Sequence, residues 1–329
     1  MSAPQGDGAE PVSAPDEHPG HPALHTAWCD LVGVRVPIVQ TGMGWVSGAR
    51  LTAATCEAGA LGILASATMT IDELRTAIAK VKERTSNPFG VNLLPNQADL
   101  SERIALLVTE GVPVASFAGA PAPDVVAQLR DAGIVTVVTV GAKRHAEKMV
   151  KIGVSALIAQ GGEGGGHTGA TPTSLLLPAV VDATEGSGVP VLGAGGFYDG
   201  RGLVAALAYG AAGIAMGTRF LLTQESHVPD HVKAIYTETP VTGTVVTTAI
   251  DGAPQRVIRT EMIEGLESSH AVVRFPKAAA NALRFARLSG TPLGDLVRSG
   301  LAMRKAQDLT WAQMALAANA PMMTKAGVV

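Results

Sequence analysis

Short apolar runs alternate with amphipathic segments along most of this chain. From residue 36 onward, runs rich in β-branched and aliphatic residues recur about every 20–35 residues. Polar, Gly or Pro clusters bound most of these runs, which is typical of β-strands. The pattern predicts eight strands, over residues 36–40, 61–65, 89–93, 112–117, 134–140, 155–160, 189–192 and 212–216.

The segments between these runs favour helices. The clearest examples are IDELRTAIAKVKERT, APDVVAQLRDAG and AKRHAEKMVKIG. Strands that alternate with helices predict βαβ units and a parallel sheet. Eight such units within about 185 residues favour one α/β architecture, a (β/α)8 TIM barrel, over an open sheet. We therefore expect the barrel to occupy residues 25–222.

The alternation is absent from both ends of the chain. Residues 1–24 are mostly Pro, Gly, Ala and acidic residues without periodicity, which predicts a disordered N-terminal tail. Residues 223–329 combine turns with helix-favouring sequence, and we expect a C-terminal, mainly helical segment that covers the substrate. Residues 271–329 carry a net charge of +6, whereas the rest of the chain carries −9. This basic segment either receives an anionic ligand, such as a phosphate-bearing thioester, or forms a solvated helical face.

Composition excludes several classes of protein. The 329 residues have a formal net charge of −3 and no Lys/Arg run, so we expect no nucleic-acid partner. The chain lacks a stretch of about 18 apolar residues, so we expect no membrane span. Only Cys29 and Cys56 occur, outside any CxxC pair, and the histidines lack metal-site spacing. We therefore expect no metal and a reducing, cytoplasmic location.

In a TIM barrel, ligands bind where the strands end, so the residues after each strand are candidates for the site. Gly42 and Gly44 follow the first strand and flank Met43. They allow the backbone to approach a flat ligand with Met43 against its face, or they form a plain tight turn. Asn92 lies at the end of the third strand. Its amide can form hydrogen bonds with the edge of a ring that carries N–H and C=O groups, or it can form hydrogen bonds with the groups of a loop.

The sixth strand leads into a loop with six glycines. Its sequence is Gln160-Gly-Gly-Glu-Gly-Gly-Gly-His167-Thr-Gly. Such a loop has little apolar content to pack, and it places an imidazole at the mouth of the barrel. Histidine titrates near neutral pH, so His167 is the candidate for proton transfer. Glu163 either shares that function or holds the loop by hydrogen bonds.

The last two strands lead into loops that suit a phosphate group. Gly195 and Gly196 follow the seventh strand, and Gly217 and Thr218 follow the eighth. Barrel phosphate sites are built from these two loops. No strand–Gly-x-Gly-x-x-Gly–helix unit with an acidic residue about 20 residues further on is present, so a dinucleotide-binding fold is not indicated. A mononucleotide phosphate with a planar ring across the mouth indicates flavin mononucleotide (FMN), and we expect Gln160 and Ala194 to line the same site.

Together these motifs resemble the flavin-dependent nitronate monooxygenase family over about residues 28–329. The motifs that carry the resemblance are QTGMGW (40–45), PFGVN (88–92), GEGGGH (162–167), GGFYDGRG (195–202) and MGTRF (216–220). Three reactions share this scaffold: oxidation of alkyl nitronates with O2, reduction of enoyl thioesters, and a branch acting on coenzyme A thioesters of a steroid ring remnant. The sequence of this chain is most similar to that of the third branch.

The resemblance implies an FMN-dependent dehydrogenase or reductase of an acyl-CoA thioester, a steroid-degradation intermediate. His167 would act as acid/base, and hydride would be exchanged at the flavin N5 atom. Arg274, Arg284 and Arg287 are candidates to hold the CoA phosphates. The alternatives are a nitronate monooxygenase, a flavin-dependent enoyl-thioester reductase, and a flavin-binding barrel without catalysis. We expect a small-molecule substrate as the partner, and a homo-oligomer is compatible with the sequence.

Overall fold

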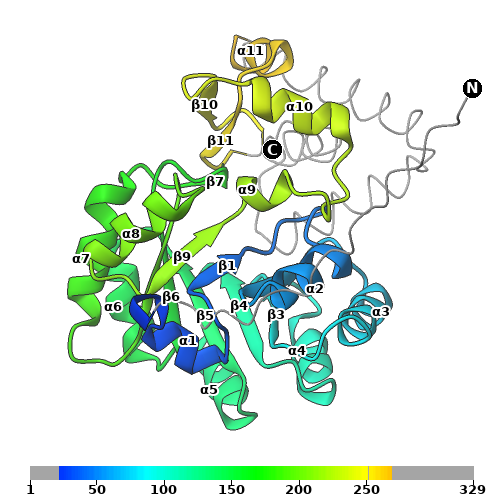
Figure 1. The fold of residues 1–329 in the computed structure, drawn as a ribbon, viewed down its shortest axis with the longest axis vertical. Coiled ribbons are helices and arrows are strands. Elements are labelled where there is room, and N and C mark those ends of the chain that lie inside the picture. The colour runs from blue at the N-terminus through cyan, green and yellow to red at the C-terminus, as the bar shows by residue number, and fades with distance from the viewer. Residues whose placement is uncertain (1–21, 251, 269–329) are drawn as a thin grey trace, which may run out of the picture.

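The computed structural model describes residues 22–250 and 252–268. Its centre is a closed barrel of parallel strands in the order β1-β2-β3-β4-β5-β6-β8-β9 (Figure 1). The barrel strands are β1 (Ile38–Gln40), β2 (Leu61–Ala65), β3 (Phe89–Leu93), β4 (Val114–Ala118), β5 (Val135–Val140), β6 (Ala156–Gln160), β8 (Val191–Ala194) and β9 (Gly213–Met216). Each predicted strand overlaps an observed one, so the (β/α)8 prediction is confirmed.

Helices surround the barrel, and two of them, α3 and α8, begin at a side-chain cap. They are α2 (Ala49–Glu57), α3 (Ile71–Lys82), α4 (Leu100–Thr109), α5 (Pro123–Asp131), α6 (Lys143–Lys151), α7 (Thr173–Thr184) and α8 (Gly200–Ala208). Thr70 and Glu73 form a reciprocal capping box at the start of α3, and Asp199 caps α8. Such caps satisfy backbone N–H groups that have no partner within the helix.

The core has two layers because successive strand residues point to opposite faces of the sheet. Val114 packs inside the barrel, whereas its neighbour Ala115 and Phe117 pack outward against the helices. The short helices η1 (Pro22–Leu24) and α1 (Ala27–Val32) precede the barrel. Trp28 of α1 is fully buried and packs with the inner layer. Helix α1 lies at the amino ends of the barrel strands, opposite their carboxyl ends (Figure 1).

A second, smaller lobe lies over the carboxyl ends of the strands (Figure 1). It contains α9 (Thr218–Leu221), α10 (Asp230–Glu238), β10 (Thr244–Thr247), β11 (Gln255–Ile258) and α11 (Glu261–Glu267). The loop after β6 contributes β7 (Gly166–His167), which joins β11 and β10 in an antiparallel three-stranded sheet. The lobe has its own apolar cluster around Ile250 and Ile263.

The sequence predicts turns and helices after residue 222, but it does not predict β10 and β11. Both strands are only four residues long, which gives period-2 alternation little length in which to show. Among the described helices, none combines the length and apolar character needed to cross a bilayer. Residues 1–21 of the expected N-terminal tail are not among the described residues. The same holds for Arg274, Arg284 and Arg287.

Candidate active site

The structure brings predicted residues from the loops after β1 and β9 and from the end of β3 into contact at the mouth of the barrel. A Cβ atom placed on Gly42 would lie 2.5 Å from the Cβ of Asn92. A Cβ on Gly217 would lie 3.4 Å from the Sδ of Met43. These loops therefore pack directly against one another, and glycine is what permits the contacts.

A buried hydroxyl holds the loop after β1. Ser47 is 1% exposed, and its Oγ accepts from Met43 N at 2.9 Å while donating to Thr41 O at 2.9 Å. Gln40, which is fully buried, donates from Nε2 to the same Oγ at 2.9 Å. Trp45, two residues after Met43, has a φ of 61° and a half-exposed side chain. The backbone around Met43 is thus fixed by side chains within its own loop.

The loops after β6, β8 and β9 also meet. A Cβ on Gly195 would lie 3.0 Å from Gly161 O and Gly164 N, and one on Gly196 would lie 3.5 Å from the Cβ of Glu163. The third contact joins Gly165 to Thr218, with 3.6 Å between the built Cβ and the Oγ1 atom. The three loops form one continuous glycine-lined surface.

This surface has the backbone features of an anion-binding loop. Gly195 and Gly196 have φ values of 95° and 81°, a left-handed conformation that favours glycine. Successive residues without side chains let an anion reach backbone N–H groups directly. Gly196 and Thr218 are exposed, and Gly195 and Gly217 are partly so. Ala194, the last residue of β8, is buried directly beneath them.

His167 is held at the edge of this surface through its backbone. Gln160, at the end of β6, donates from Nε2 to His167 O at 2.7 Å. The residue belongs to β7, and its side chain is exposed. The loop thus presents the imidazole outward at the mouth of the barrel, while Gln160 sets the path of the main chain behind it.

Glu163 holds the glycine loop by hydrogen bonds, which is one of the two roles that the sequence suggests for it. Its Oε2 accepts from the backbone N of Thr173 at 2.9 Å and from Thr173 Oγ1 at 2.7 Å, so the carboxylate lies at the start of α7. Partial burial opposes ionisation, but the Thr173 hydrogen bonds and the charge of Arg256 outweigh it and lower the pKa of Glu163. Glu163 is therefore ionised when it fixes the loop to α7.

Two residues of β11 act on the same loop, and sequence analysis missed both. Arg256 donates from Nε and Nη2 to Gly162 O at 3.0 and 2.9 Å, and from Nη1 to Thr244 Oγ1 at 2.9 Å. Gln255, 4% exposed, places its Nε2 3.1 Å from the Nε2 of His167. About 90 residues separate these partners in the chain, so no local pattern could relate them.

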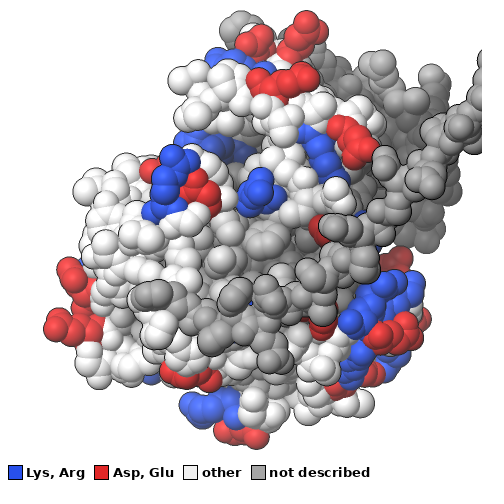
Figure 2. Space-filling view, viewed as in Figure 1, with Lys and Arg blue, Asp and Glu red and all other residues white. Residues whose placement is uncertain are grey.

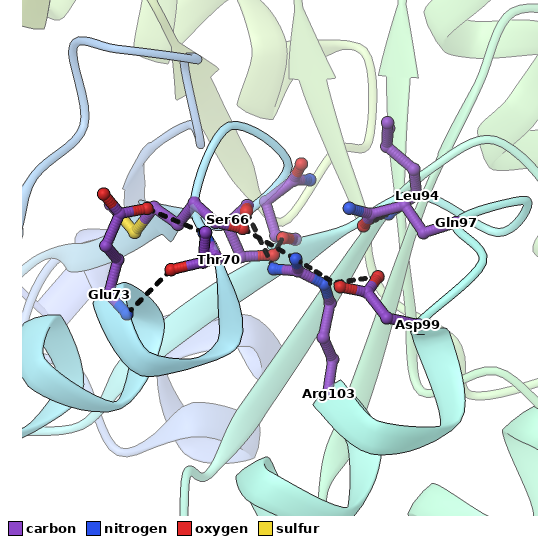
Figure 3. A network of polar contacts seen from close by, with 9 residues as sticks. Ser66, Thr70, Glu73, Leu94, Gln97, Asp99 and Arg103 are labelled. Atoms are coloured by element: carbon purple, nitrogen blue, oxygen red, sulfur yellow. Dashed lines mark hydrogen bonds and ion pairs between the residues drawn. The ribbon is translucent and has the colours of Figure 1, made fainter. Parts of the chain in front are cut away.

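A buried arginine joins the loops after β2 and β3 on the other side of the mouth (Figure 3). Arg103 of α4 is 3% exposed and donates to Ser66 O at 2.9 Å and Met69 O at 2.7 Å. It also binds both carboxylate oxygens of Asp99, at 2.9 and 2.7 Å. Ser66 Oγ in turn donates to Asn92 O at 2.5 Å. The network fixes the backbone that carries Asn92.

Two hollows lie near these elements. One of about 240 Å³ separates the glycine loop from the lobe and is lined by Gly165, Thr218 and Arg256 among others. A larger one, about 650 Å³, lies outside the barrel between α2 and α3. Charges of both signs gather over α3 there (Figure 2), and no predicted site residue lines it. We therefore place the candidate site at the barrel mouth.

In the described residues, no group of three or more His, Cys, Asp and Glu side chains is placed to hold a metal ion. A closed parallel barrel with glycine loops after β6, β8 and β9 and a histidine at its mouth defines a cofactor-binding TIM-barrel enzyme. The family model described as "Nitronate monooxygenase" matches residues 25–327, and the chain belongs to this family. The protein is accordingly an oxidoreductase, and its family is one of flavoproteins, which indicates a flavin cofactor.

This chain is similar in sequence and in fold to several known proteins. The chain is 56% identical over 306 residues to (3aS,4S,5R,7aS)-5-hydroxy-7a-methyl-1-oxo-octahydro-1H-indene-4-carboxyl-CoA dehydrogenase of Mycobacterium tuberculosis, covering 93% of this chain and 86% of that protein. It is 32% identical to a probable nitronate monooxygenase of Staphylococcus saprophyticus, covering 79% and 87%. Among solved structures, FabK from Thermotoga maritima superposes with a TM-score of 0.72 at 34% identity, covering 80% and 84%.

Proposed function

We propose that this protein is an FMN-dependent oxidoreductase of an acyl-CoA thioester, with His167 as its acid/base. One observation carries the proposal. Gly165, in the loop that carries His167, contacts Thr218 of the predicted phosphate surface. A flavin bound through its phosphate at this surface would thus lie next to the loop that carries His167, the predicted proton-transfer residue.

Two sets of residues at the mouth would bind the two ends of FMN, its phosphate and its planar ring. Backbone N–H groups of the loops after β8 and β9 would bind the phosphate, and residues after β1 and β3 would lie along the planar ring. Gln160 and Ala194 complete the site at the ends of the adjacent strands β6 and β8. The phosphate set is Gly195, Gly196, Gly217 and Thr218, and the ring set is Gly42, Met43, Gly44 and Asn92.

His167 suits a proton transfer next to a thioester. A thioester acidifies the proton on its α-carbon, and a neutral imidazole is a competent base near neutral pH. FMN, when bound, supplies hydride exchange at N5. The Mycobacterium tuberculosis relative is named for a 5-hydroxyl beside carbon 4, which bears the carboxyl-CoA group. A hydroxyl on the β-carbon fits oxidation there: the β-carbon would lose a hydride and the α-carbon would lose a proton to His167, which gives the enol form of the β-keto thioester.

The CoA portion would be held outside the barrel. Residues 271–329 carry a net charge of +6, and we assign the CoA phosphates to Arg274, Arg284 and Arg287 within that segment. Residues 223–329 would then cover the substrate, and the described part of this segment lies over the strand ends (Figure 1). Reversal of all three arginine charges should raise KM for CoA thioesters and leave flavin content unchanged. The assignment includes a cytoplasmic location, where CoA thioesters are made and used.

The variant His167→Ala tests the role of His167. It should bind FMN as the wild type does, because the phosphate loops are intact, and lose about 10²–10⁴-fold in turnover. The matched control is His145→Ala, an exposed histidine on α6, which should keep full activity. Wild-type turnover in His167→Ala would refute the assignment.

The placement of the phosphate has its own test. Gly217→Asp puts a carboxylate against the phosphate, and the purified protein should be colourless. Gly200→Asp is the control, because a Cβ at Gly200 meets no atom within 4 Å and an acidic residue suits the first turn of α8. A normally yellow Gly217→Asp protein would contradict the placement.

The substrate class is tested by anaerobic mixing. Bleaching of the flavin spectrum by a β-hydroxyacyl-CoA and not by an alkyl nitronate supports the proposed reaction. The family name favours one alternative, nitronate oxidation. Bleaching by the nitronate alone would assign the protein to that reaction.

A further inference from the structure

The hollow between the glycine loop and the lobe brings a cation next to the predicted phosphate surface. Its volume is about 240 Å³. The barrel loops line it with Gly165 and Thr218, and β11 of the lobe lines it with Arg256 and Val257. A Cβ atom built on Gly165 would lie 3.6 Å from the Oγ1 of Thr218. Arg256 and Thr218 therefore border one common space next to the glycine loop.

Arg256 is held in place and still has donors for a ligand. The residue is half-buried. Its Nε and Nη2 atoms donate to Gly162 O at 3.0 and 2.9 Å, and its Nη1 atom donates to Thr244 Oγ1 at 2.9 Å. A guanidinium group has five N–H groups, and these bonds use one each on Nε, Nη1 and Nη2. One N–H on each Nη atom is left to bind a ligand in the hollow.

A phosphate in this hollow would need a cation. The predicted phosphate set consists of three glycines and Thr218, and none of them is charged. A phosphate monoester carries a charge of roughly −1.5 to −2 near neutral pH. Glu163 also lines the hollow, and its Cβ lies 3.5 Å from a Cβ built on Gly196, so its carboxylate would repel the phosphate. Among the described residues that line the hollow, Arg256 is the only cation, and it can offset this repulsion.

We propose that Arg256 is a cofactor-binding residue, which binds the phosphate group of FMN from the lobe side of the hollow and neutralises its charge. The planar guanidinium group donates parallel N–H bonds to phosphate oxygens. The bonds to Gly162 and Thr244 fix its orientation before the ligand binds, which lowers the cost of ordering the side chain. This inference rests on the proposed function, which places the FMN phosphate at the neighbouring loops.

The test compares FMN with riboflavin, which lacks the phosphate. The full chain is loaded with either flavin by exchange and then diluted, and the fluorescence of the released flavin gives each Kd. Arg256→Met should weaken FMN binding about 10–100-fold and leave riboflavin binding nearly unchanged. Arg256→Lys keeps the charge and should retain most of the preference for FMN. Equal losses for both flavins would show that Arg256 only supports the loop, and would overturn the inference.

Two other arginines serve as comparisons. Arg259 lies just beyond β11 and is exposed, so Arg259→Met makes the same change on the lobe and should leave both Kd values unchanged. Arg219 follows Thr218 in the chain, and its side chain is exposed. It is not among the described residues that line the hollow. A lost preference for FMN in Arg219→Met, with the preference kept in Arg256→Met, would assign the phosphate to Arg219 instead.

Glu163→Gln gives a second measurement that leaves Arg256 intact. The amide keeps an acceptor for Thr173 and removes the negative charge from the hollow, so FMN should bind more tightly while riboflavin binding stays the same. This variant decides if Arg256→Met fails to fold. An FMN preference equal to that of the wild type would show that charges lining the hollow do not act on the phosphate, which would overturn the inference.

The phosphate groups of CoA have the same chemistry, and the experiment separates them from that of FMN. In protein saturated with FMN, Arg256→Met should bind CoA as the wild type does. Weaker CoA binding with an intact preference for FMN would assign Arg256 to CoA and overturn the inference. If the wild type binds riboflavin as tightly as FMN, the phosphate placement in the proposed function fails as well. If the wild type prefers FMN and Arg256→Met keeps that preference, only the inference about Arg256 fails.

Discussion

Gly42 and Asn92 approach so closely that a Cβ on Gly42 would lie 2.5 Å from the Cβ of Asn92. That separation is shorter than any normal carbon–carbon contact, and it joins the loop after β1 to the end of β3. The contact places two predicted flavin residues from different strands side by side. It also fixes the distance between the backbone of Met43 and the amide of Asn92.

Gly42→Ala should therefore damage both stability and flavin binding. The added methyl group must displace Asn92 or the loop, and overpacking of this kind costs about 1–3 kcal/mol. Thermal unfolding and the absorbance ratio of flavin to protein measure the two effects. Gly141→Ala, at the end of β5, is the control because a Cβ there meets nothing within 4 Å. Equal flavin content in the two variants would contradict the expected clash.

Acid should weaken the arginine network at the mouth. The hydrogen bonds and charge of Arg103 outweigh partial desolvation and hold the pKa of Asp99 below its ordinary value of 3.8. The ionised carboxylate therefore stabilises the fold above that ordinary value, and this contribution is lost as the pH falls through the lowered one. Unfolding by urea across this range should show a weaker pH dependence in Asp99→Asn than in the wild type.

The matched control is Asp131→Asn. Asp131 also pairs with an arginine, but both side chains of that pair are exposed, at 75% and 60%, and exposed pairs contribute little. Its unfolding should follow the wild-type pH dependence. An Asp99→Asn protein with an unchanged pH dependence would show that the Arg103 pair does not contribute to stability in this way.

Removal of the carboxylate that ties the glycine loop to α7 should lower both stability and turnover. Glu163→Ala leaves the Thr173 N–H without its acceptor, whereas the Thr173 hydroxyl keeps Gly195 O as an acceptor at 3.0 Å. The loss is comparable to that of a helix cap, about 1–2 kcal/mol. Thermal unfolding measures the first effect and kcat the second, since His167 lies in the same loop. Glu185→Ala, at the other end of α7, should change neither quantity.

Both cysteines should be unreactive in the native protein. Cys29 and Cys56 are each 1% exposed, and burial raises the pKa of Cys56 to about 11. The thiolate is the reactive form, so a thiol-specific dye at neutral pH should label neither residue. Unfolding in guanidinium chloride should then expose both thiols to the dye. Rapid labelling of Cys56 before unfolding would show that α2 opens locally.

The sequence alone determined the barrel, its strands and most of the candidate site. These features follow from local causes: β-branched runs form strands, helical spacing forms helices, and Gly-rich segments after strands lie at one end of a barrel. Gly42, Gly195, Gly217 and His167 could be singled out for that reason. The three glycines each follow within two residues of the strand that places them, and His167 follows β6 by seven residues.

Only the tertiary structure decided what surrounds His167. Gln255 and Arg256 lie about 90 residues beyond the glycine loop, on a short strand that pairs with β7 only once the lobe has folded over the barrel. The close contact of Gly42 with Asn92 and the link from Arg103 to Ser66 arise in the same way. Contacts between distant segments depend on how whole elements pack, and no pattern within a few residues records that packing.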